Sequence, residues 1–380
     1  MDAITTQVLI VGAGPAGLAA AIGLAERKID FVIIDALPEA QNTSRAAVIH
    51  AATLESLRAL KVSDRLIRQG IKVPHFRIRD RDSVLLETDF SDLSTPTPFA
   101  LMIPQDETEQ ILIDRLSELG HQVLRPVEFA RYETHSQGIR ASCTGKQDIT
   151  IDARYMVGAD GEKSAVRSAA CIAFPGNTYG SFMLADVRMN WPIDRNEVTL
   201  FFSGAGTLVV APMSRERYRV VAQWGDAPST PTINDVQNII DARGPRSGVH
   251  VRELIWGSRF QVHHKLADRF QEGNVLLLGD AAHVHSPAGG QGMNLGLRDA
   301  QALSSALGEA LRNGSEAALR SYAQERRQAA AEVLKMTDRL TKVATMGNPA
   351  ARWIRNRLIA ALGTLPVVRR AAARRLAGYS

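Results

Sequence analysis

The chain has 380 residues, of which 45% are hydrophobic and 22% charged, a composition typical of a folded globular protein large enough for two domains. Its two cysteines, Cys143 and Cys171, exclude a disulfide framework and a cysteine-based metal site, and they favour a reducing, cytoplasmic setting. The net charge of +5 hides an asymmetry: nine cations and no acid follow Asp338, so residues 1–338 carry a net charge of −4.

The N-terminus and the apolar stretches show no sign of membrane targeting. A first strand is predicted to begin within about seven residues of the start, which leaves no room for a signal peptide. No apolar stretch reaches the ~20 residues of a membrane-spanning helix. We therefore expect a cytoplasmic protein with no integral membrane contact and no nucleic-acid partner.

The first predicted unit is the stretch VLIVGAGPAGLAAAIGLAERKIDFVIID, residues 8–35. Its apolar start favours a buried parallel strand, its Ala- and Leu-rich centre a helix, and its end a second strand. Gly12, Gly14 and Gly17 lie between strand and helix, where a tight turn, the approach of a phosphate and close helix–strand packing each need glycine. Asp35 follows the second strand, where an acid accepts hydrogen bonds from an adenosine ribose. The stretch predicts a dinucleotide site for FAD or NAD; a glycine-rich turn without a ligand is the alternative.

Further elements follow in chain order. The pattern predicts a helix at about 52–69, strands at 73–100, an amphipathic helix at 105–119 and short strands over 122–158. From about 173 to 265, alternating segments such as VTLFFSGAGTLVVAPM predict an antiparallel sheet. Helical patterning returns after Pro287 and continues to the end. A sheet domain is therefore inserted into the nucleotide-binding domain, and a ligand cleft is expected where the two meet.

Two later stretches each contain a buried strand that ends in a turn. YMVGADGEKSAVR contains Asp160–Gly161, and NVLLLGDAAHVHSPAGGQGMNLGLRDA contains Gly279–Asp280. Asp280 is placed to accept hydrogen bonds from hydroxyl groups. The amides of Gly289, Gly290 and Gly292, with a helix behind them, are placed to stabilise negative charge.

Together the three motifs resemble the class A flavoprotein aromatic monooxygenases of the p-hydroxybenzoate hydroxylase type. The resemblance covers nearly the whole chain, with two departures: Ala52 stands where the family often has arginine, and no thioredoxin-like C-terminal domain is visible. It implies that Asp160–Gly161 contributes to FAD and NAD(P)H binding and that Gly279–Asp280 holds the ribityl chain. The FAD-binding residues that it implies are Gly12, Gly14, Pro15, Ala16, Gly17, Asp35, Arg45, Gln105, Asp160, Gly161, Gly279, Asp280, Pro287, Gly290, Gly292, Met293 and Asn294.

The resemblance also implies a fold and a reaction. The fold is α/β, with a Rossmann-like FAD-binding domain of the GR2 type (1–72, 101–172 and 266–340), an inserted β-sheet substrate domain (73–100 and 173–265) and a C-terminal helical tail (341–380). NAD(P)H, bound transiently, would reduce the flavin, and a flavin C4a-hydroperoxide formed with O2 would hydroxylate an aromatic, phenol-type small molecule. The catalytic base, the choice between NADH and NADPH and the formation of a homodimer are left open.

Several alternatives share this fold. They are an epoxidase, a Baeyer–Villiger enzyme, a reductase, a non-enzymatic flavin-binding redox sensor and a peripheral membrane hydroxylase of quinone precursors. A halogenase is disfavoured because only Trp191–Pro192 resembles its tryptophan motif. His283 and His285 make a poor metal site at their spacing, so we expect no metal and assign them to structural or flavin-neighbour roles. Arg298 and Asp299 have no better interpretation than helix-surface charges.

The basic tail is predicted to form helices. Gly363 and Pro366 divide it into two short pieces, and its apolar residues recur at helical spacing. We expect these helices to pack on the protein's own surface or on a partner subunit rather than on a membrane. That contact would depend mainly on Trp353, Ile354, Leu358 and Leu362.

Overall fold

The computed structural model describes residues 3–379 except 41–45, 214–215, 226, 287–288, 345, 347 and the side chain of Tyr179. Two of the predicted cofactor residues, Arg45 and Pro287, lie outside the described residues. Within the described part, no helix is both long and apolar enough to cross a bilayer.

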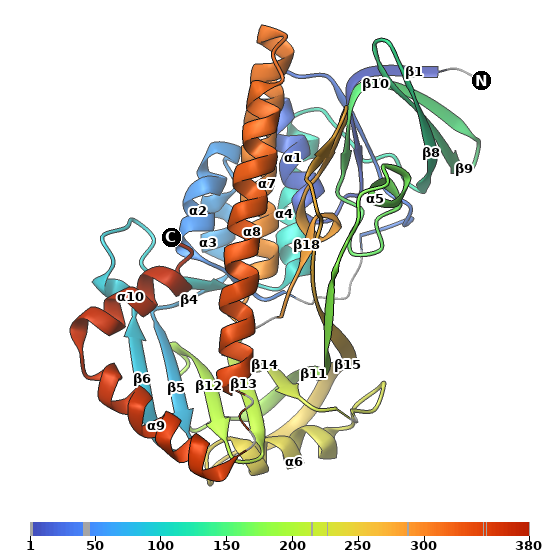
Figure 1. Ribbon diagram of the computed structural model, residues 1–380. Helices are drawn as coiled ribbons and strands as arrows, with labels where there is room; N and C mark the ends of the chain where they lie inside the picture. Colours follow the sequence, from blue (N-terminus) through green and yellow to red (C-terminus); the bar gives the residue numbers. More distant parts are fainter. Residues whose placement is uncertain are drawn as a thin grey trace.

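A seven-stranded sheet forms the first half of the molecule (Figure 1). Its parallel centre consists of β1 (Ala3–Val11), β2 (Phe31–Ile34), β10 (Ile149–Gly158) and β17 (Val275–Leu277). The apolar runs in these strands are buried on both faces, as expected for a parallel sheet covered on each side. The antiparallel strands β8 (Val127–His135), β9 (Gly138–Gly145) and β16 (Gln271–Glu272) extend the sheet at its edges.

Helices cover this sheet. α1 (Pro15–Glu26), α4 (Gln105–Glu118) and α7 (Gln291–Asn313) share one hydrophobic core with the side chains of Val8 and Ile10. The short α5 (Ala165–Ala169) lies over the other face. The prediction of a single helix at 52–69 is wrong. The chain instead forms α2 (Ala51–Leu57), the 3₁₀ turn η1 (Arg58–Leu60) and α3 (Ser63–Gln69). Lys61 adopts a left-handed conformation (φ 61°) that interrupts the helix.

An eight-stranded sheet forms the second half, in the order β18-β15-β11-β14-β13-β12-β5-β6. Most of its strands come from the predicted antiparallel region: β11 (Gly176–Asn190), β12 (Glu197–Ser203), β13 (Gly206–Pro212), β14 (Arg217–Gln223) and β15 (His250–Leu266). The strands β5 (His75–Asp80), β6 (Ser83–Asp89) and β18 (His283–Val284) join from elsewhere in the chain. A small sheet of β3 (Val48–Ile49), β7 (Ala100–Met102) and β4 (Ile71–Val73) completes the strands.

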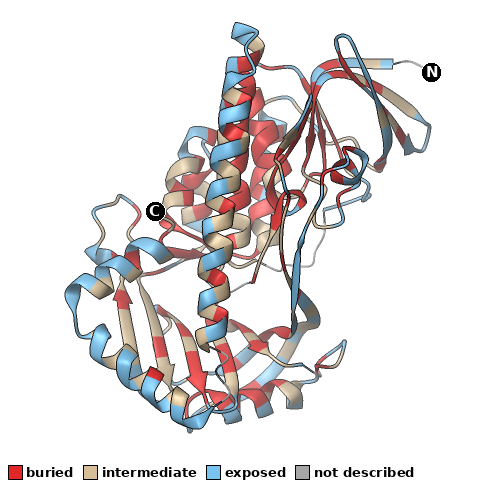
Figure 2. Ribbon diagram, viewed as in Figure 1, coloured by how far each residue is buried: buried red, intermediate tan, exposed pale blue. Residues whose placement is uncertain are grey.

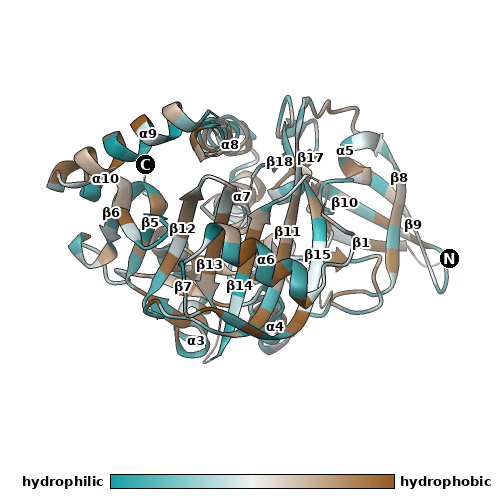
Figure 3. Cartoon of the chain, turned by 90° about the horizontal axis from the view of Figure 1, so that it is seen from below, coloured by the Kyte–Doolittle hydropathy of each residue, from teal (hydrophilic) through white to brown (hydrophobic). Residues whose placement is uncertain are grey.

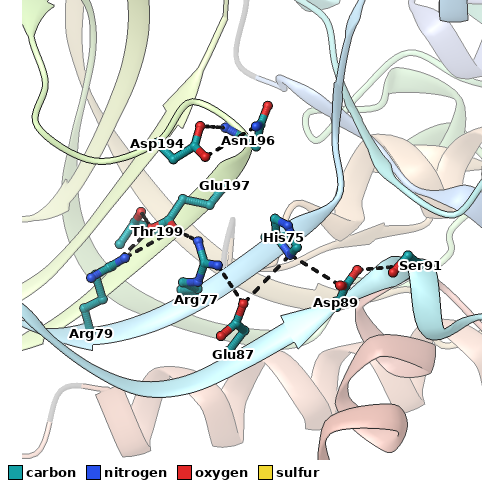
Figure 4. A network of polar contacts seen from close by, with 10 residues as sticks. All are labelled: His75, Arg77, Arg79, Glu87, Asp89, Ser91, Asp194, Asn196, Glu197 and Thr199. Atoms are coloured by element: carbon teal, nitrogen blue, oxygen red, sulfur yellow. Dashed lines mark hydrogen bonds and ion pairs between the residues drawn. The ribbon is translucent and has the colours of Figure 1, made fainter.

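At β5 and β12, the two faces of the eight-stranded sheet differ in polarity. Side chains alternate along each strand, so Phe76 and Ile78 point to one face of β5 and Arg77 and Arg79 to the other. On the polar face, Glu197 of β12 is fully buried and pairs with both arginines (Figure 4). On the same face, the helix α6 (Ile233–Arg243), which was not predicted, covers an apolar cluster that includes Phe201 of β12 and Leu208 of β13. The apolar face is left to line a cavity.

Three C-terminal helices complete the fold. α8 (Ala317–Ala344) extends from the top of the molecule to the eight-stranded sheet, and α9 (Pro349–Gly363) and α10 (Pro366–Leu376) follow the edge of that sheet at β6 (Figure 1). The tail thus lies on the protein's own body, but not through the expected residues. Trp353, Ile354, Leu358 and Leu362 are 62%, 52%, 57% and 50% exposed, and the contact is made instead by residues such as Arg355, Ala373 and Ala377. Helical spacing identified an apolar face correctly but could not tell which way it points.

Candidate cofactor and substrate site

A single cavity of about 1450 Å³ lies where the two sheets meet, larger than the ~300–1,000 Å³ of a typical small-molecule pocket. It extends from the β1–α1 turn to the apolar face of the eight-stranded sheet and is also lined by α8 and α10. Gly17 and Asn294 lie outside its wall, and Arg45 and Pro287 are not described. The predicted residues that line it are Gly12, Gly14, Pro15, Ala16, Asp35, Gln105, Asp160, Gly161, Gly279, Asp280, Gly290, Gly292 and Met293.

The glycines of the first turn differ in their surroundings. Gly12 has φ +104°, and a Cβ there would lie 2.4 Å from the carbonyl oxygen of Ala159. A Cβ at Gly17 would lie 2.0 Å from the Gly12 oxygen, so this glycine permits α1 to approach β1. A Cβ at Gly14 would meet no protein atom within 4 Å, because Gly14 faces the cavity. A ligand phosphate could therefore approach the backbone at Gly14 and the N-terminus of α1.

Asp35 is held at the end of β2 by backbone groups. The N–H of Ala13 donates to its Oδ2 at 2.7 Å, and the N–H of Leu37 donates to its Oδ1 at 2.9 Å. Arg125, which carries no motif and was not predicted, places Nη1 3.5 Å from Oδ1 and also lines the cavity. Since a carboxylate has about four lone-pair positions, Asp35 retains acceptor capacity for the hydroxyls of a ribose.

The Asp160–Gly161 turn contains a carboxylate that is only partly satisfied. The N–H of Val166 donates to Asp160 Oδ2 at 3.1 Å, whereas the buried Oδ1 has no hydrogen-bond partner among the described residues. Burial raises the pKa of this carboxyl group, against the opposing effect of its hydrogen bonds. Arg167 donates to the carbonyl of Ala281 at 2.8 Å and thereby ties this turn to the turn at Gly279–Asp280. The second and third motifs thus share one wall of the cavity.

The N-terminus of α7 points into the cavity. Gly290 caps the helix in the left-handed conformation (φ 62°), and a Cβ there would lie 2.1 Å from Val48. Asn294 stands behind the wall: it accepts from the N–H of His50 at 2.8 Å and donates to the carbonyls of Val48 and Gly290 at 2.9 and 2.7 Å. The first turn of α7 contains no acid, so its positive end is available to an anion.

The interpretation of Asp299 as a surface charge is wrong. Its side chain is fully buried, receives a hydrogen bond from His283 Nε2 at 2.6 Å and pairs with Arg326 Nε at 2.7 Å. Burial would raise the pKa of this carboxyl group, but His283 and Arg326 outweigh that effect and lower it. Arg298 donates to the carbonyl of Gly378 at 2.8 Å and is not a free surface charge either. His283 is thus a structural residue that fixes the loop after Gly279–Asp280.

Arg219 connects the eight-stranded sheet to the cofactor end of the cavity. Its guanidinium makes two bonds of 2.8 Å to Asp186 and donates to the carbonyl of Ala46 at 3.0 Å. Both charged residues are almost completely buried, and Arg217 adds a third bond to Asp186 at 2.5 Å. Burial opposes the ionised form of Asp186, but the two arginines lower its pKa. From the helix side, Gln105 accepts from the N–H of Ala46 at 3.2 Å and donates to Glu109, another buried cavity residue that was not predicted.

The opposite end of the cavity is apolar. Aromatic and aliphatic side chains from β5, β11, β12, β13 and β15 form this wall, with few polar groups. A planar hydrophobic molecule would be shielded from water there. The lining residues of this kind are Phe76, Ile78, Phe182, Leu184, Val198, Leu200, Phe202, Val209 and Phe260.

The residues of the cavity fit an FAD molecule together with a second ligand. Gly14 leaves room for phosphates, Asp35 can accept from a ribose, and Asp160 Oδ1 lacks a partner that a ligand group would supply. Among the described residues, no cluster of histidine, cysteine or acidic side chains could hold a metal ion.

Comparison with known proteins identifies relatives of one kind. A family described as FAD binding domain matches residues 5–337. The 6-methylpretetramide 4-monooxygenase of Streptomyces rimosus is 33% identical over 91% of this chain and 63% of its own length. An uncharacterized aromatic compound monooxygenase of Bacillus subtilis is 33% identical over 89% of this chain and 68% of its own. The solved structure of the OxyS anhydrotetracycline hydroxylase of Streptomyces rimosus superimposes with a TM-score of 0.82 at 29% identity, covering 99% of this chain and 77% of that one. This chain therefore spans about two thirds of the length of the first two of these relatives.

Proposed function

The chain belongs to the class A FAD-dependent aromatic monooxygenases, as its motifs predicted, and from that premise we propose that it hydroxylates an aromatic, phenol-type small molecule with NAD(P)H and O2. FAD is the cofactor of this family. The main support for the proposal is that one cavity joins the three sequence motifs to an apolar wall. Bound FAD supplies the redox chemistry, by accepting a hydride equivalent from NAD(P)H and activating O2 for transfer of one oxygen atom.

The residues at the cofactor end of the cavity would bind and orient FAD. We assign the pyrophosphate to the backbone of Gly14 and the N-terminus of α1, and the adenosine ribose to Asp35. The amides of Gly290 and Gly292 at the start of α7 stabilise negative charge on the isoalloxazine ring. Asp280, which lines the cavity, would bind the ribityl hydroxyls, and Gln105 holds the backbone at Ala46 in the cavity wall.

The residues at the substrate end exclude water. The apolar wall shields the reacting centre, which favours oxygen transfer over loss of reducing equivalents as hydrogen peroxide. Arg219, held by Asp186, bonds to the backbone of Ala46 and so would hold the substrate wall to the cofactor end of the cavity. We infer from this wall an aromatic substrate of low polarity.

The relatives are named for 6-methylpretetramide, anhydrotetracycline and aromatic compounds, which supports an aromatic substrate. A cytoplasmic location is part of the proposal, supported by the two free cysteines, buried Cys143 and exposed Cys171. The formation of a homodimer stays a prediction, which a molar mass from light scattering can test.

The experiment is rapid-mixing reduction of the purified protein. The flavin absorbance is followed after addition of NADH or NADPH, with and without each member of a panel of phenols and fused-ring aromatics. The proposal expects at least one aromatic to accelerate reduction. Fast reduction that no aromatic changes would contradict it and would favour a redox sensor or a reductase.

A further inference from the structure

The helix α9 presents its apolar face to solvent. Trp353, Ile354, Leu358 and Leu362 recur at helical spacing, and each is at least half exposed. Leu365 and Val367, at the junction with α10, are 49% and 77% exposed and continue the same surface. Figure 2 shows the exposed outer sides of α9 and α10, and Figure 3 shows the hydrophobic stretches on α9. These six residues are called the α9 outer face.

Polar groups hold the inner face of α9 to the body. The buried Arg355 donates to the carbonyls of Val343, at 2.8 Å, and Phe202, at 3.5 Å, and stacks over the Phe202 ring. Asn356 donates to Asp80 at 2.7 Å. An ordinary surface helix buries its apolar side and exposes its polar side, so α9 is oriented the opposite way. Because contacts with the body already order the helix, binding of a partner to the outer face would not require the entropic cost of ordering it.

Exposed cations lie on the same two helices as the outer face. Arg357 lies beside Trp353, with its guanidinium 4.9 Å from the ring centre, and Arg370, Arg374 and Arg375 are exposed on α10. No acid follows Asp338 in the sequence. A symmetric dimer through this face would bring the same cations of two copies together, which is unfavourable. An anionic surface has the complementary charge.

We propose that the α9 outer face docks in the plane of an anionic lipid bilayer. Tryptophan and leucine on one side of a helix, with arginine around them, form the pattern of a helix that lies in a membrane interface. The two short pieces, which would be poor membrane helices on their own, form one surface here because both are packed on the same sheet edge. This docking involves no membrane-spanning segment.

The surface is continuous with the cavity. Val367 belongs to the outer face and also lines the cavity, together with Val368, Ala371 and Leu376 of α10. An apolar aromatic dissolved in a bilayer could pass along α10 to the apolar wall. This consequence rests on the proposed function, whereas the docking itself does not.

The test is sedimentation of the full chain with its cofactor in the presence of lipid vesicles. Vesicles of phosphatidylcholine and phosphatidylglycerol are compared with vesicles of phosphatidylcholine alone, at low and high salt. We expect binding to the anionic vesicles that is about tenfold stronger and weakens with salt. The double variant Leu358→Ser/Leu362→Ser should lose most of it, and Arg370→Gln/Arg374→Gln should lose its salt-dependent part. Ile255→Ser, which changes an exposed apolar residue on β15, is the matched control and should bind normally.

Three outcomes would overturn the proposal. One is that the folded, yellow protein sediments with neither kind of vesicle. Another is equal binding to both kinds, which would remove the role of the cations. The third is a dimer in light scattering that Leu358→Ser/Leu362→Ser converts to a monomer, which would assign the outer face to a second copy. None of these measurements uses enzyme activity, so their failure is distinct from failure of the proposed function.

Discussion

The backbone N–H of Ala13 donates a hydrogen bond of 2.7 Å to the Asp35 carboxylate, which joins the glycine turn after β1 to the end of β2. The same carboxylate faces the cavity, so it serves both the turn and any ribose bound there.

Asp35→Asn should therefore weaken FAD retention. The amide keeps the size of the side chain but loses its charge and one acceptor oxygen, and a hydrogen bond to a charged group contributes ~1.5–3 kcal/mol. We expect the dissociation constant of FAD to rise about tenfold or more, measured by fluorescence of flavin released on dilution. Asp30→Asn removes an exposed carboxylate just before β2 and should leave retention unchanged. Equal retention in both variants would show that Asp35 does not contact the cofactor.

Substitutions at two neighbouring glycines should separate folding from binding. Gly12→Ala places a Cβ 2.4 Å from Ala159 O at a positive φ, so the free energy of unfolding should fall by about 2 kcal/mol or more. Gly14→Ala meets no protein atom within 4 Å, so the cofactor-free protein should keep its stability while its FAD affinity falls. Urea unfolding and FAD titration on the two variants measure this. A Gly14→Ala protein with normal FAD affinity would place the phosphates elsewhere.

Asp299 should contribute to stability as a buried charge. Asp299→Asn leaves the mostly buried Arg326 without its carboxylate and should cost about 3 kcal/mol of unfolding free energy in urea. Because the folded state lowers the pKa of Asp299 below its ordinary 3.8, its contribution is present above about pH 4 and is lost as the pH falls further. Asp114→Asn, on the exposed side of α4, is the control. A loss of stability equal to that of the control would contradict a stabilising role for the buried contacts of Asp299 with His283 and Arg326.

His50 should make the free energy of unfolding depend on pH in a higher range than Asp299 does. Burial lowers its pKa from 6.5 to about 4, so the folded protein keeps it neutral while the unfolded chain binds a proton. The free energy of unfolding should therefore decrease as the pH falls from about 6.5 to about 4, by ~3 kcal/mol for this residue. His50→Gln should reduce that dependence in urea unfolding at several pH values, and a further part should remain because burial also lowers the pKa of His285 to about 4. An unchanged slope in His50→Gln would contradict this effect of burial on His50.

The motifs could be predicted because local sequence determines them. Each follows a buried strand, and glycine at Gly12 or Gly290 is required by the backbone itself. Arg125, Glu109 and Arg219 could not be predicted, since their contacts with Asp35, Gln105 and Ala46 join segments far apart in the sequence. The helix α6 had a readable signal in the capping box of Thr232 and Asp235. The domain boundaries and the assignment of individual residues to FAD stay predictions.

The direction of an amphipathic face is a different kind of problem. The spacing of Trp353, Ile354 and Leu358 shows that they share one side of a helix. Which side turns inward depends on the carbonyl groups that accept hydrogen bonds from Arg355, and these belong to α8 and β12. Tertiary contacts of this kind leave no trace in the periodicity of the helix.

Isotope incorporation distinguishes oxygen transfer to an aromatic molecule from unproductive oxidation of NAD(P)H. The protein is supplied with NAD(P)H, labelled O2 and the aromatic that best accelerates flavin reduction, and the products are analysed by mass spectrometry. We expect one labelled oxygen atom in a hydroxylated product, formed in proportion to the NAD(P)H consumed. NAD(P)H consumption that yields only hydrogen peroxide and unchanged aromatic, with every aromatic that accelerates reduction, would contradict it.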